Sequence, residues 1–412
     1  MPKPREQSPG NAPGELKSRK SRPQHMSERS YFDWNATAPL RPQARRAAEA
    51  ALSLAGNPSS VHAEGRAARR VVEDARQQVA ALVGAPASNV VFTSSGTEAN
   101  ILALSPAWQT AADKRPCNRL LISAVEHSSV RAGGRFAREA VAEIPVDAAG
   151  RVNLTALEAL AKSGRSLVSL MLANNETGVI QPVAEAAEII HAAGGLLHVD
   201  AVQAVGRIPC DITALGADLL TLSAHKIGGL KGTGALVRAS EDTHLADPLI
   251  RGGGQERGLR AGTENVAGIA AFGAAAATAR EEGEAEAKRM HALRDQLEAG
   301  LRSIAPRTVI FGLGAERLPN TTLFSLEGMK AETAVIAFDL EGIAVSSGAA
   351  CSSGKVQPSH VLAAMGVSPE LLRGAVRLSL GCDTTESDLE RLLNAWRKLA
   401  TALSKGRRGI AA

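Results

Sequence analysis

Between residues 45 and 280, short apolar runs alternate with longer amphipathic segments, and no other feature restricts the fold as strongly. The short runs predict buried strands, and the longer segments repeat their apolar residues at helical spacing. The predicted strands cover 90–93, 120–123, 167–172, 196–199 and 219–222, and the predicted helices cover 44–55, 63–82, 182–193 and 265–280. The expected buried face of helix 63–82 consists of Ala67, Val71, Ala75, Val79 and Leu82. This order of elements indicates an α/β fold with a parallel sheet.

The C-terminal third predicts a second, smaller domain. A charged helix over 281–304 leads into it, with apolar residues three or four positions apart. Further strands are expected at 321–326, 344–346 and 376–379. We therefore predict a disordered tail (1–30), a large domain (45–285), and a small α+β domain formed by 31–44 together with 286–412. With 412 residues the chain is long enough for two such cores.

Residues 1–30 differ in composition from the rest of the chain. They hold seven Lys or Arg against three Glu, and so supply most of the formal charge of +5. The remainder is nearly neutral and lacks a basic stripe with interleaved aromatic residues, so we expect no nucleic-acid binding. The tail has no apolar core of the secretory type, and the apolar helix at 266–279 is too short to span a bilayer. We expect a cytoplasmic protein without membrane contact; a transit peptide and a start at Met26 are both open for the tail.

The four cysteines, Cys117, Cys210, Cys351 and Cys382, are widely separated. Their spacing matches neither a disulfide framework nor a metal site. We expect a reducing compartment and no resident metal.

Lys226 follows a buried strand and precedes a glycine-rich turn, within the stretch LLTLSAHKIGGLKGTGALV at 219–237. A lysine held there is partly desolvated, so a fraction of it is neutral and able to form a Schiff base. The alternative is an ordinary surface lysine in a turn.

A turn from strand to helix at 91–100 (VFTSSGTEAN) ends a second predicted strand. The backbone amides and the Thr97 hydroxyl would bind a phosphate at the helix N-terminus, or would merely cap the helix. Asp200 ends the strand at 196–199, and Gln203 follows. A carboxylate there would keep a pyridine nitrogen protonated, or would itself cap a helix.

Two more polar motifs follow predicted strands. His127, after the strand at 120–123, could stack on an aromatic ring, or could be a structural histidine. The motif NNETG at 174–178 could belong to the site or be only a turn. One ligand has a phosphate for Thr97, a ring face for His127, a ring nitrogen for Asp200 and a carbonyl for Lys226. That ligand is pyridoxal 5'-phosphate.

As a set, the motifs resemble those of the cysteine desulfurases of the nitrogen-fixation and housekeeping iron–sulfur type, in the class V aminotransferase superfamily. The resemblance covers about 30–400. It is carried by FDWNATAP (32–39), GNPSSVH (56–62), FTSSGTEAN (92–100), EHSSV (126–130), NNETGVIQP (174–182), HVDAVQAVG (198–206), SAHKIGGLKGTGAL (223–236), GGGQERGLRAGTENV (252–266), SSGAACSSG (346–354) and VRLSLG (376–381).

The resemblance implies a fold-type-I pyridoxal-phosphate transferase, with a mainly parallel sheet of the seven-stranded type in the large domain. It implies catalytic roles for Lys226, Cys351 and His127. It implies cofactor contacts from Gly96, Thr97, His127, Asn175, Asp200, Gln203, Ser223, His225, Lys226 and Thr263. Asn175 and Arg377 would bind the substrate carboxylate. Thr263 would reach the phosphate of the other subunit, which implies a homodimer.

Cys351 lies in a run of Ser, Gly, Ala and Cys at 346–354 that suits a mobile loop. By resemblance its thiolate takes the sulfur of L-cysteine as a persulfide and leaves L-alanine. The alternative is a small buried residue. The loop matches the longer form, found in enzymes that pass sulfur to an acceptor protein such as an iron–sulfur scaffold, and any contact of Cys351 with a cluster would be transient.

The sequence departs from the family at Gly229–Leu230, at Cys382 and in the tail. Other class V enzymes, an aminotransferase or a selenocysteine lyase, and a catalytically silent partner-binding homologue are the alternative functions. The sulfur acceptor, the preference between cysteine and selenocysteine, and the translation of residues 1–25 stay open.

Overall fold

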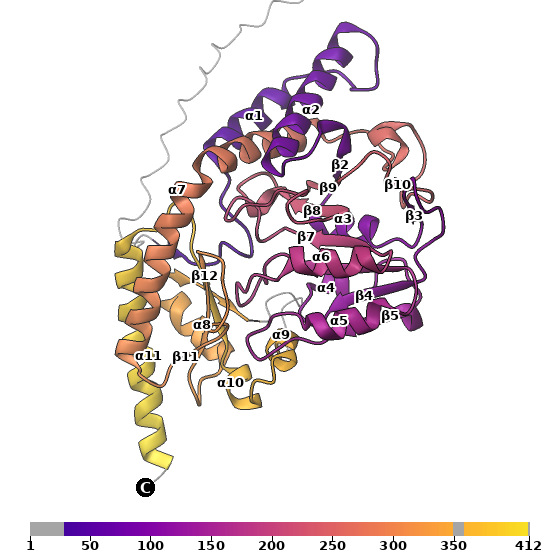
Figure 1. Ribbon diagram of the computed structural model, residues 1–412. Coiled ribbons are helices and arrows are strands. Elements are labelled where there is room, and N and C mark those ends of the chain that lie inside the picture. Colours follow the sequence, from indigo (N-terminus) through magenta and orange to yellow (C-terminus); the bar gives the residue numbers. More distant parts are fainter. Residues whose placement is uncertain (1–28, 349–357, 411–412) are drawn as a thin grey trace, which may run out of the picture.

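The computed structural model describes residues 29–348 and 358–410. Its centre is a seven-stranded sheet in the order β2-β9-β8-β7-β6-β4-β5 (Figure 1). The strands are β2 (Val90–Thr93), β4 (Arg119–Ser123), β5 (Val141–Ile144), β6 (Ser166–Met171), β7 (Leu196–Asp200), β8 (Leu219–Ser223) and β9 (Gly234–Arg238). The neighbours from β8 to β5 pair in parallel, and β9 runs antiparallel to both β2 and β8. The predicted fold class, with a mainly parallel sheet of seven strands, is confirmed.

Helices cover both faces of this sheet. The seven that pack around it are α1 (Pro42–Leu52), α2 (Ala63–Leu82), α3 (Gly96–Ala103), α4 (Ser128–Arg131), α5 (Leu154–Ala161), α6 (Val183–Ala192) and the first half of α7 (Val266–Ile304). Successive strand residues alternate between two apolar clusters. Leu219 packs with Leu102 of α3, whereas Leu220 packs with Val79 of α2 and Phe272 of α7. Both strand faces are therefore buried, which is why the strands appear as continuous apolar runs.

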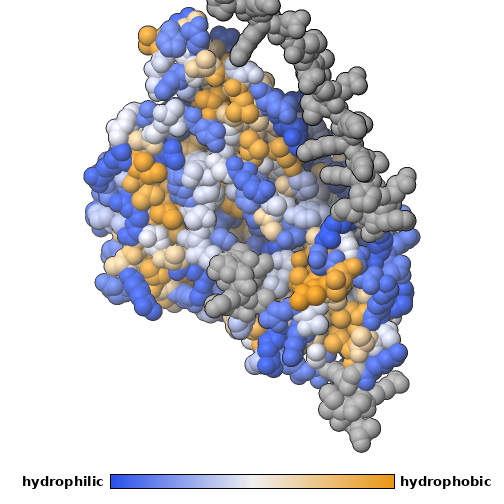
Figure 2. All heavy atoms as spheres, turned by 180° about the vertical axis from the view of Figure 1, so that it is seen from behind, coloured by the Kyte–Doolittle hydropathy of each residue, from blue (hydrophilic) through white to orange (hydrophobic). Residues whose placement is uncertain are grey.

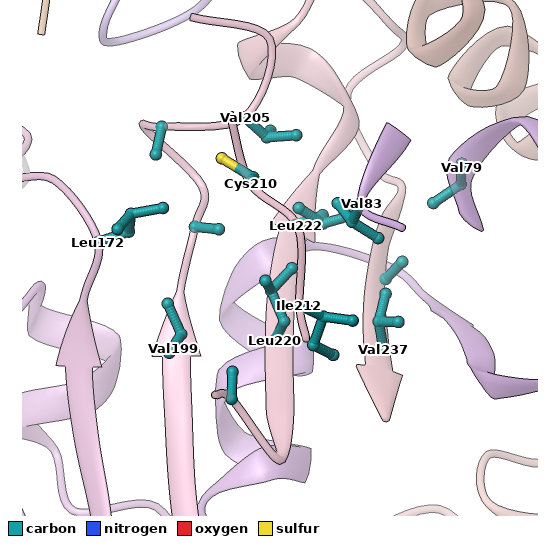
Figure 3. Packing of buried hydrophobic residues seen from close by; sticks show 14 of the residues in the cluster. Val79, Val83, Leu172, Val199, Val205, Cys210, Ile212, Leu220, Leu222 and Val237 are labelled. Atoms are coloured by element: carbon teal, nitrogen blue, oxygen red, sulfur yellow. The ribbon is translucent and has the colours of Figure 1, made fainter. Parts of the chain in front are cut away.

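Figure 3 shows part of the larger cluster, between β7, β8 and β9 and the residues Val79, Val83 and Ile212. Cys210 lies within it, and burial raises the pKa of its thiol to about 12. On α2 the buried residues include Ala68, Val72 and Arg76, whereas Ala67 is exposed. Ala75 and Val79 are buried as predicted, but the buried face is rotated from the predicted one toward Ala68, Val72 and Arg76. The Arg76 guanidinium turns inward because it donates two hydrogen bonds to the carboxylate of Glu256.

A four-stranded antiparallel sheet, in the order β11-β12-β15-β14, lies beside the large one. Its strands are β11 (Val309–Ile310), β12 (Thr321–Ser325), β14 (Ser346–Ser347) and β15 (Val376–Ser379). The helices in this part of the chain are α8 (Ala331–Leu340), α9 (His360–Ala364), α10 (Pro369–Arg373) and α11 (Glu386–Ile410). The N-terminal strand β1 (Ser30–Tyr31) pairs in parallel with β13 (Ile343–Ala344). A small ribbon, β3 (Trp108–Gln109) with β10 (His244–Leu245), lies apart from both sheets.

The helix α7 runs without interruption for 39 residues, where two helices were predicted (Figure 1). Phe272, in its first half, packs in the core of the large sheet. Leu293 and Leu297, in its second half, pack in the core of the small sheet. The segment contains no proline, which would break or kink the helix. One continuous helix can therefore contribute apolar residues to both cores. In the described part of the chain, no helix is long and apolar enough to cross a membrane.

Candidate active site

Four strand ends of the large sheet carry polar side chains of the site. Asp200 ends β7 and Ser223 ends β8, with Lys226 three residues further on in a short 3₁₀ turn. His127 follows β4, and Asn175 follows β6. Carboxyl ends of parallel strands meet at one sheet edge, which is where open α/β sheets bind ligands. These ends line a cavity of about 270 Å³, together with Ser95, Gly96, Thr97, Asn100, Ser129, Met171, Ala173, Val202, Gln203 and His225.

The N-terminus of α3 forms one end of this cavity. Ser95 caps the helix by accepting a hydrogen bond from the Glu98 amide. The turn packs so closely on β9 that a Cβ at Gly234 would lie 2.4 Å from the Ser95 carbonyl carbon. A Cβ at Gly96 would lie 3.1 Å from Cβ of Ser223. Small residues therefore leave the amides of the first helical turn accessible to an anion such as a phosphate.

Lys226 lies against a segment from the N-terminal end of the described chain. Its Nζ donates to the carbonyl oxygens of Asn35 (2.5 Å) and Ala36 (2.9 Å). Gln203 Nε2 donates to the same Asn35 carbonyl at 3.0 Å. Burial, helped by the charge of Lys226, lowers the pKa of neighbouring His225 to about 4. His225 is therefore neutral at pH 7 and adds no second positive charge beside the lysine.

Asp200 lies across the cavity, and both of its carboxylate oxygens accept hydrogen bonds. Oδ1 accepts from the Val202 amide at 3.0 Å, and Oδ2 accepts from Asn100 Nδ2 at 2.9 Å. On His127, the ring atom Nδ1 accepts from the Ser129 amide at 3.2 Å and lies 2.8 Å from Ser129 Oγ. The donor set suits pyridoxal phosphate: helix amides for the phosphate, a carboxylate for the ring nitrogen, and an amine for the carbonyl.

Arg377 adjoins the cavity without lining it. Its guanidinium, on β15, donates to the Asn175 carbonyl at 2.9 Å and to Asp33 Oδ1 at 2.8 Å. Its buried Nε has no hydrogen-bond partner among the described residues. A buried guanidinium with a spare donor, next to Asn175, is suited to a substrate carboxylate.

Two other predicted site residues do not join this group. Thr263 is exposed and does not line the cavity of its own chain. Cys351 lies outside the described residues. No group of three or more His, Cys, Asp or Glu side chains within the described ranges could hold a metal ion.

The sequence of this chain is similar to those of known proteins. The family model of the class-V aminotransferases matches residues 30–392. A cysteine desulfurase of Cereibacter sphaeroides is 44% identical over 89% of this chain and 94% of its own length. The chain belongs to the class-V aminotransferases, in the cysteine desulfurase family. The cysteine desulfurase IscS of Dictyoglomus turgidum is 39% identical over 92% of this chain and 96% of that protein.

Solved structures of this family have the same fold. A NifS-like protein from Rickettsia africae superimposes with a TM-score of 0.81, at 36% identity, over 90% of this chain and 99% of that one. SspA in complex with cysteine gives a TM-score of 0.72 at 27% identity, over 85% of this chain and 99% of its own.

Several residues in the site of this cysteine desulfurase family member were missed by sequence reasoning. Asn35 links Lys226 and Gln203 to the small sheet, because its own amide donates to Thr321 Oγ1 at 2.9 Å. Asn100 joins Asp200 to Ser129. Both asparagines lie inside motifs quoted for the resemblance, but nothing in a motif states which distant residue a side chain will contact.

Glu176 is a further buried carboxyl that the sequence did not single out. Ser359 Oγ donates to it at 2.6 Å, and a Cβ at Gly348 would lie 3.4 Å from its Oε2. It therefore lies against the described chain on both sides of residues 349–357. Burial raises the pKa of Glu176 to about 7, although Arg377 and His127 oppose the change.

The raised pKa of Glu176 makes stability depend on pH. Because its ordinary value is 4.5, the native protein holds a proton between about pH 4.5 and 7 that the unfolded chain releases. The free energy of unfolding of the wild-type protein is therefore expected to fall as the pH rises through this window, by up to about 3 kcal/mol from this group. Glu176→Gln keeps an acceptor for Ser359 and should remove that loss. Thermal midpoints at pH 5 and pH 8, at fixed protein and cofactor concentrations, test this; an unchanged pH dependence in the variant would contradict it.

Proposed function

We propose that this protein is a pyridoxal-phosphate-dependent cysteine desulfurase that converts L-cysteine to L-alanine and transfers the sulfur to Cys351. The observation that carries the proposal is the convergence of Lys226, Asp200, His127 and the N-terminus of α3 on one cavity. SspA, which has the same fold, was captured with cysteine, and this supports cysteine as the substrate. A sulfur-acceptor protein, such as an iron–sulfur scaffold, is the expected partner.

The residues of the cavity would divide the work between holding the cofactor and moving protons. Gly96, Thr97, Ser223 and His225 would hold the phosphate, with Thr263 of a second subunit. Asp200 and Gln203 would hold the ring nitrogen and the phenolic oxygen, and His127 would stack on the ring. When bound, pyridoxal phosphate supplies a ring that withdraws electrons from the α-carbon of the substrate.

Lys226 Nζ would take the α-proton of cysteine and return a proton later, because a neutral amine acts as a general base and its protonated form as a general acid. Arg377 and Asn175 would orient the substrate carboxylate. The Cys351 thiolate would attack the substrate sulfur, so that an S–S bond forms as the Cβ–S bond breaks. The electron pair of the broken bond stays on the carbon fragment, which takes up protons and leaves as alanine. The overall change needs no outside oxidant: cysteine and a thiol give alanine and a persulfide.

The test of this function is the product balance. The purified yellow protein, supplied with L-cysteine and dithiothreitol, should release alanine and sulfide in equal amounts. Accumulation of the pyridoxamine form when alanine is supplied as the amino donor, with neither alanine nor sulfide released from cysteine, would instead identify an aminotransferase. A protein that stays colourless with added cofactor would refute the enzyme assignment and favour a silent homologue.

The composite site can be tested by mixing variants. Exposed apolar side chains, including Leu52, Val61 and Ile250, suit a second copy of this chain, and Figure 2 shows apolar groups reaching the surface among charged ones. In a dimer with shared sites, a Lys226→Ala subunit paired with a Thr263→Ala subunit forms one site with both native residues. Mixed subunits should therefore regain activity that neither variant has alone. If mixing restores nothing although exchange of subunits is shown by labelling, the shared site is wrong.

A further inference from the structure

A chain of buried polar side chains runs behind the cavity, from β6 to α3. Ser169 Oγ lies 2.8 Å from His198 Nδ1, and His198 Nε2 lies 3.2 Å from Thr221 Oγ1. Thr221 Oγ1 in turn donates to Asn100 Oδ1 at 2.6 Å. Each of these four residues is at most 2% exposed. Of the four, Asn100 alone lines the cavity.

The end of this chain fixes its direction. Asn100 Nδ2 donates both to Asp200 Oδ2 and to Ser129 Oγ, at 2.9 Å each. With the amide reversed, its oxygen would face the carboxylate and both would be acceptors. Asn100 Oδ1 therefore faces Thr221, which must donate its hydroxyl proton.

The remaining hydrogen bonds follow from that one. Since the Thr221 hydroxyl donates to Asn100, its oxygen accepts from His198 Nε2. Nδ1 of the neutral His198 ring is then an acceptor, and Ser169 donates to it. Burial lowers the pKa of His198 to about 4, in agreement with a neutral ring. Every donor in the chain thus points from β6 toward the cavity.

Asn100 connects this hydrogen-bond chain to two residues of the site, Asp200 and, through Ser129, His127. Asp200 receives an N–H at each carboxylate oxygen, which fixes the orientation of the carboxylate in the cavity. Ser129 Oγ accepts from Asn100 and therefore donates its own proton to His127 Nδ1, which also accepts the Ser129 amide. His127 Nδ1 is thereby an acceptor, and a neutral ring carries its proton on Nε2.

We propose that Asn100, Thr221 and His198 are positioning residues, whose one-way hydrogen-bond chain holds the Asp200 carboxylate in place and fixes the ring of His127. The proposal rests on the proposed function, because Asp200 and His127 act in catalysis only with pyridoxal phosphate in the cavity. It adds three residues that do not perform the chemistry but set the orientation of two that would contact the ring.

Thr221→Val tests the chain at a position outside the cavity, with a side chain of nearly the same shape. The variant loses the donor to Asn100 and the acceptor for His198. An unsatisfied buried group of this kind is expected to lower kcat and cofactor affinity by about ten-fold each, with KM for cysteine changed less than about two-fold. The absorption spectrum of the bound cofactor should shift, because the protonation of its ring nitrogen depends on Asp200. Thr221→Ser keeps the hydroxyl and should restore all four readouts.

A loss in Thr221→Ser as large as that in Thr221→Val would show that retaining the hydroxyl does not preserve function, and would overturn the proposal. So would a Thr221→Val protein with wild-type kcat and spectrum. If Thr221→Val does not fold, Thr221→Ala also removes the hydroxyl that donates to Asn100, and a spectrum and kcat identical to wild type would be equally decisive against the proposal. A wild-type protein that binds cofactor but does not react with cysteine would refute the proposed function alone, since spectrum and cofactor affinity still compare the variants.

Discussion

Lys226→Ala is expected to bind pyridoxal phosphate without the yellow absorption of a Schiff base, and to lose alanine formation by about 10³-fold or more. Lys226 follows the end of β8, its Nζ donates to two backbone carbonyls, and among the described residues that line the cavity it is the lysine. Absorption spectra and a single-turnover assay for alanine measure both effects.

Lys231 offers a matched control for this variant. It lies five residues further along the same glycine-rich stretch, and it is exposed. Lys231→Ala should retain the yellow colour and wild-type activity within about two-fold, because a solvated lysine contributes little to a buried site. If Lys226→Ala kept its Schiff base and Lys231→Ala lost it, the assignment of the catalytic lysine would be wrong.

Cys351→Ser is expected to abolish alanine formation from cysteine while the cofactor stays bound and yellow. A hydroxyl is a far weaker nucleophile toward sulfur than a thiolate, so the Cβ–S bond should remain intact. Mass spectrometry should find one added sulfur atom on the wild-type chain after a single turnover, and none on the variant. Full alanine production by Cys351→Ser in the presence of reductant would reject Cys351 as the sulfur carrier.

Cys382 is the appropriate control for the cysteine variant. It is half-buried, and burial raises the pKa of its thiol to about 11, so it is almost entirely protonated at neutral pH. Cys382→Ser should therefore leave alanine formation unchanged. A loss comparable to that of Cys351→Ser would show that the sulfur passes through a second thiol.

The sheet and the strand-end residues were predictable because they depend on local pattern. Apolar runs gave β7 and β8, and the rule that parallel strands end at one edge brought Asp200 and Lys226 together. The antiparallel strand β9 was not anticipated, because apolar runs do not reveal strand direction. The domain boundaries and the roles of Thr263 and Cys351 stay predictions.

The long-range contacts of Asn35 and Arg76 could not be predicted from the sequence, for a different reason. Asn35 contacts Thr321, which is 286 residues away, and Arg76 contacts Glu256, 180 residues away. These pairings are created by the tertiary fold and leave no periodic trace in the sequence. The apolar periodicity of α2 predicts that Arg76 faces the solvent. Arg76 is buried instead, because it forms a buried ion pair with Glu256.

The unbroken α7 has a consequence for how the molecule melts. Its backbone hydrogen bonds continue from a half that fills one core to a half that fills the other, so loosening of either core strips packing from a helix that both need. The two cores should therefore unfold together, in one thermal transition rather than two. A fragment cut near residue 285 would lose the partner surface for Met290, Leu293, Leu297 and Leu301, and the two halves of the enzyme should not be separable as independent folding units.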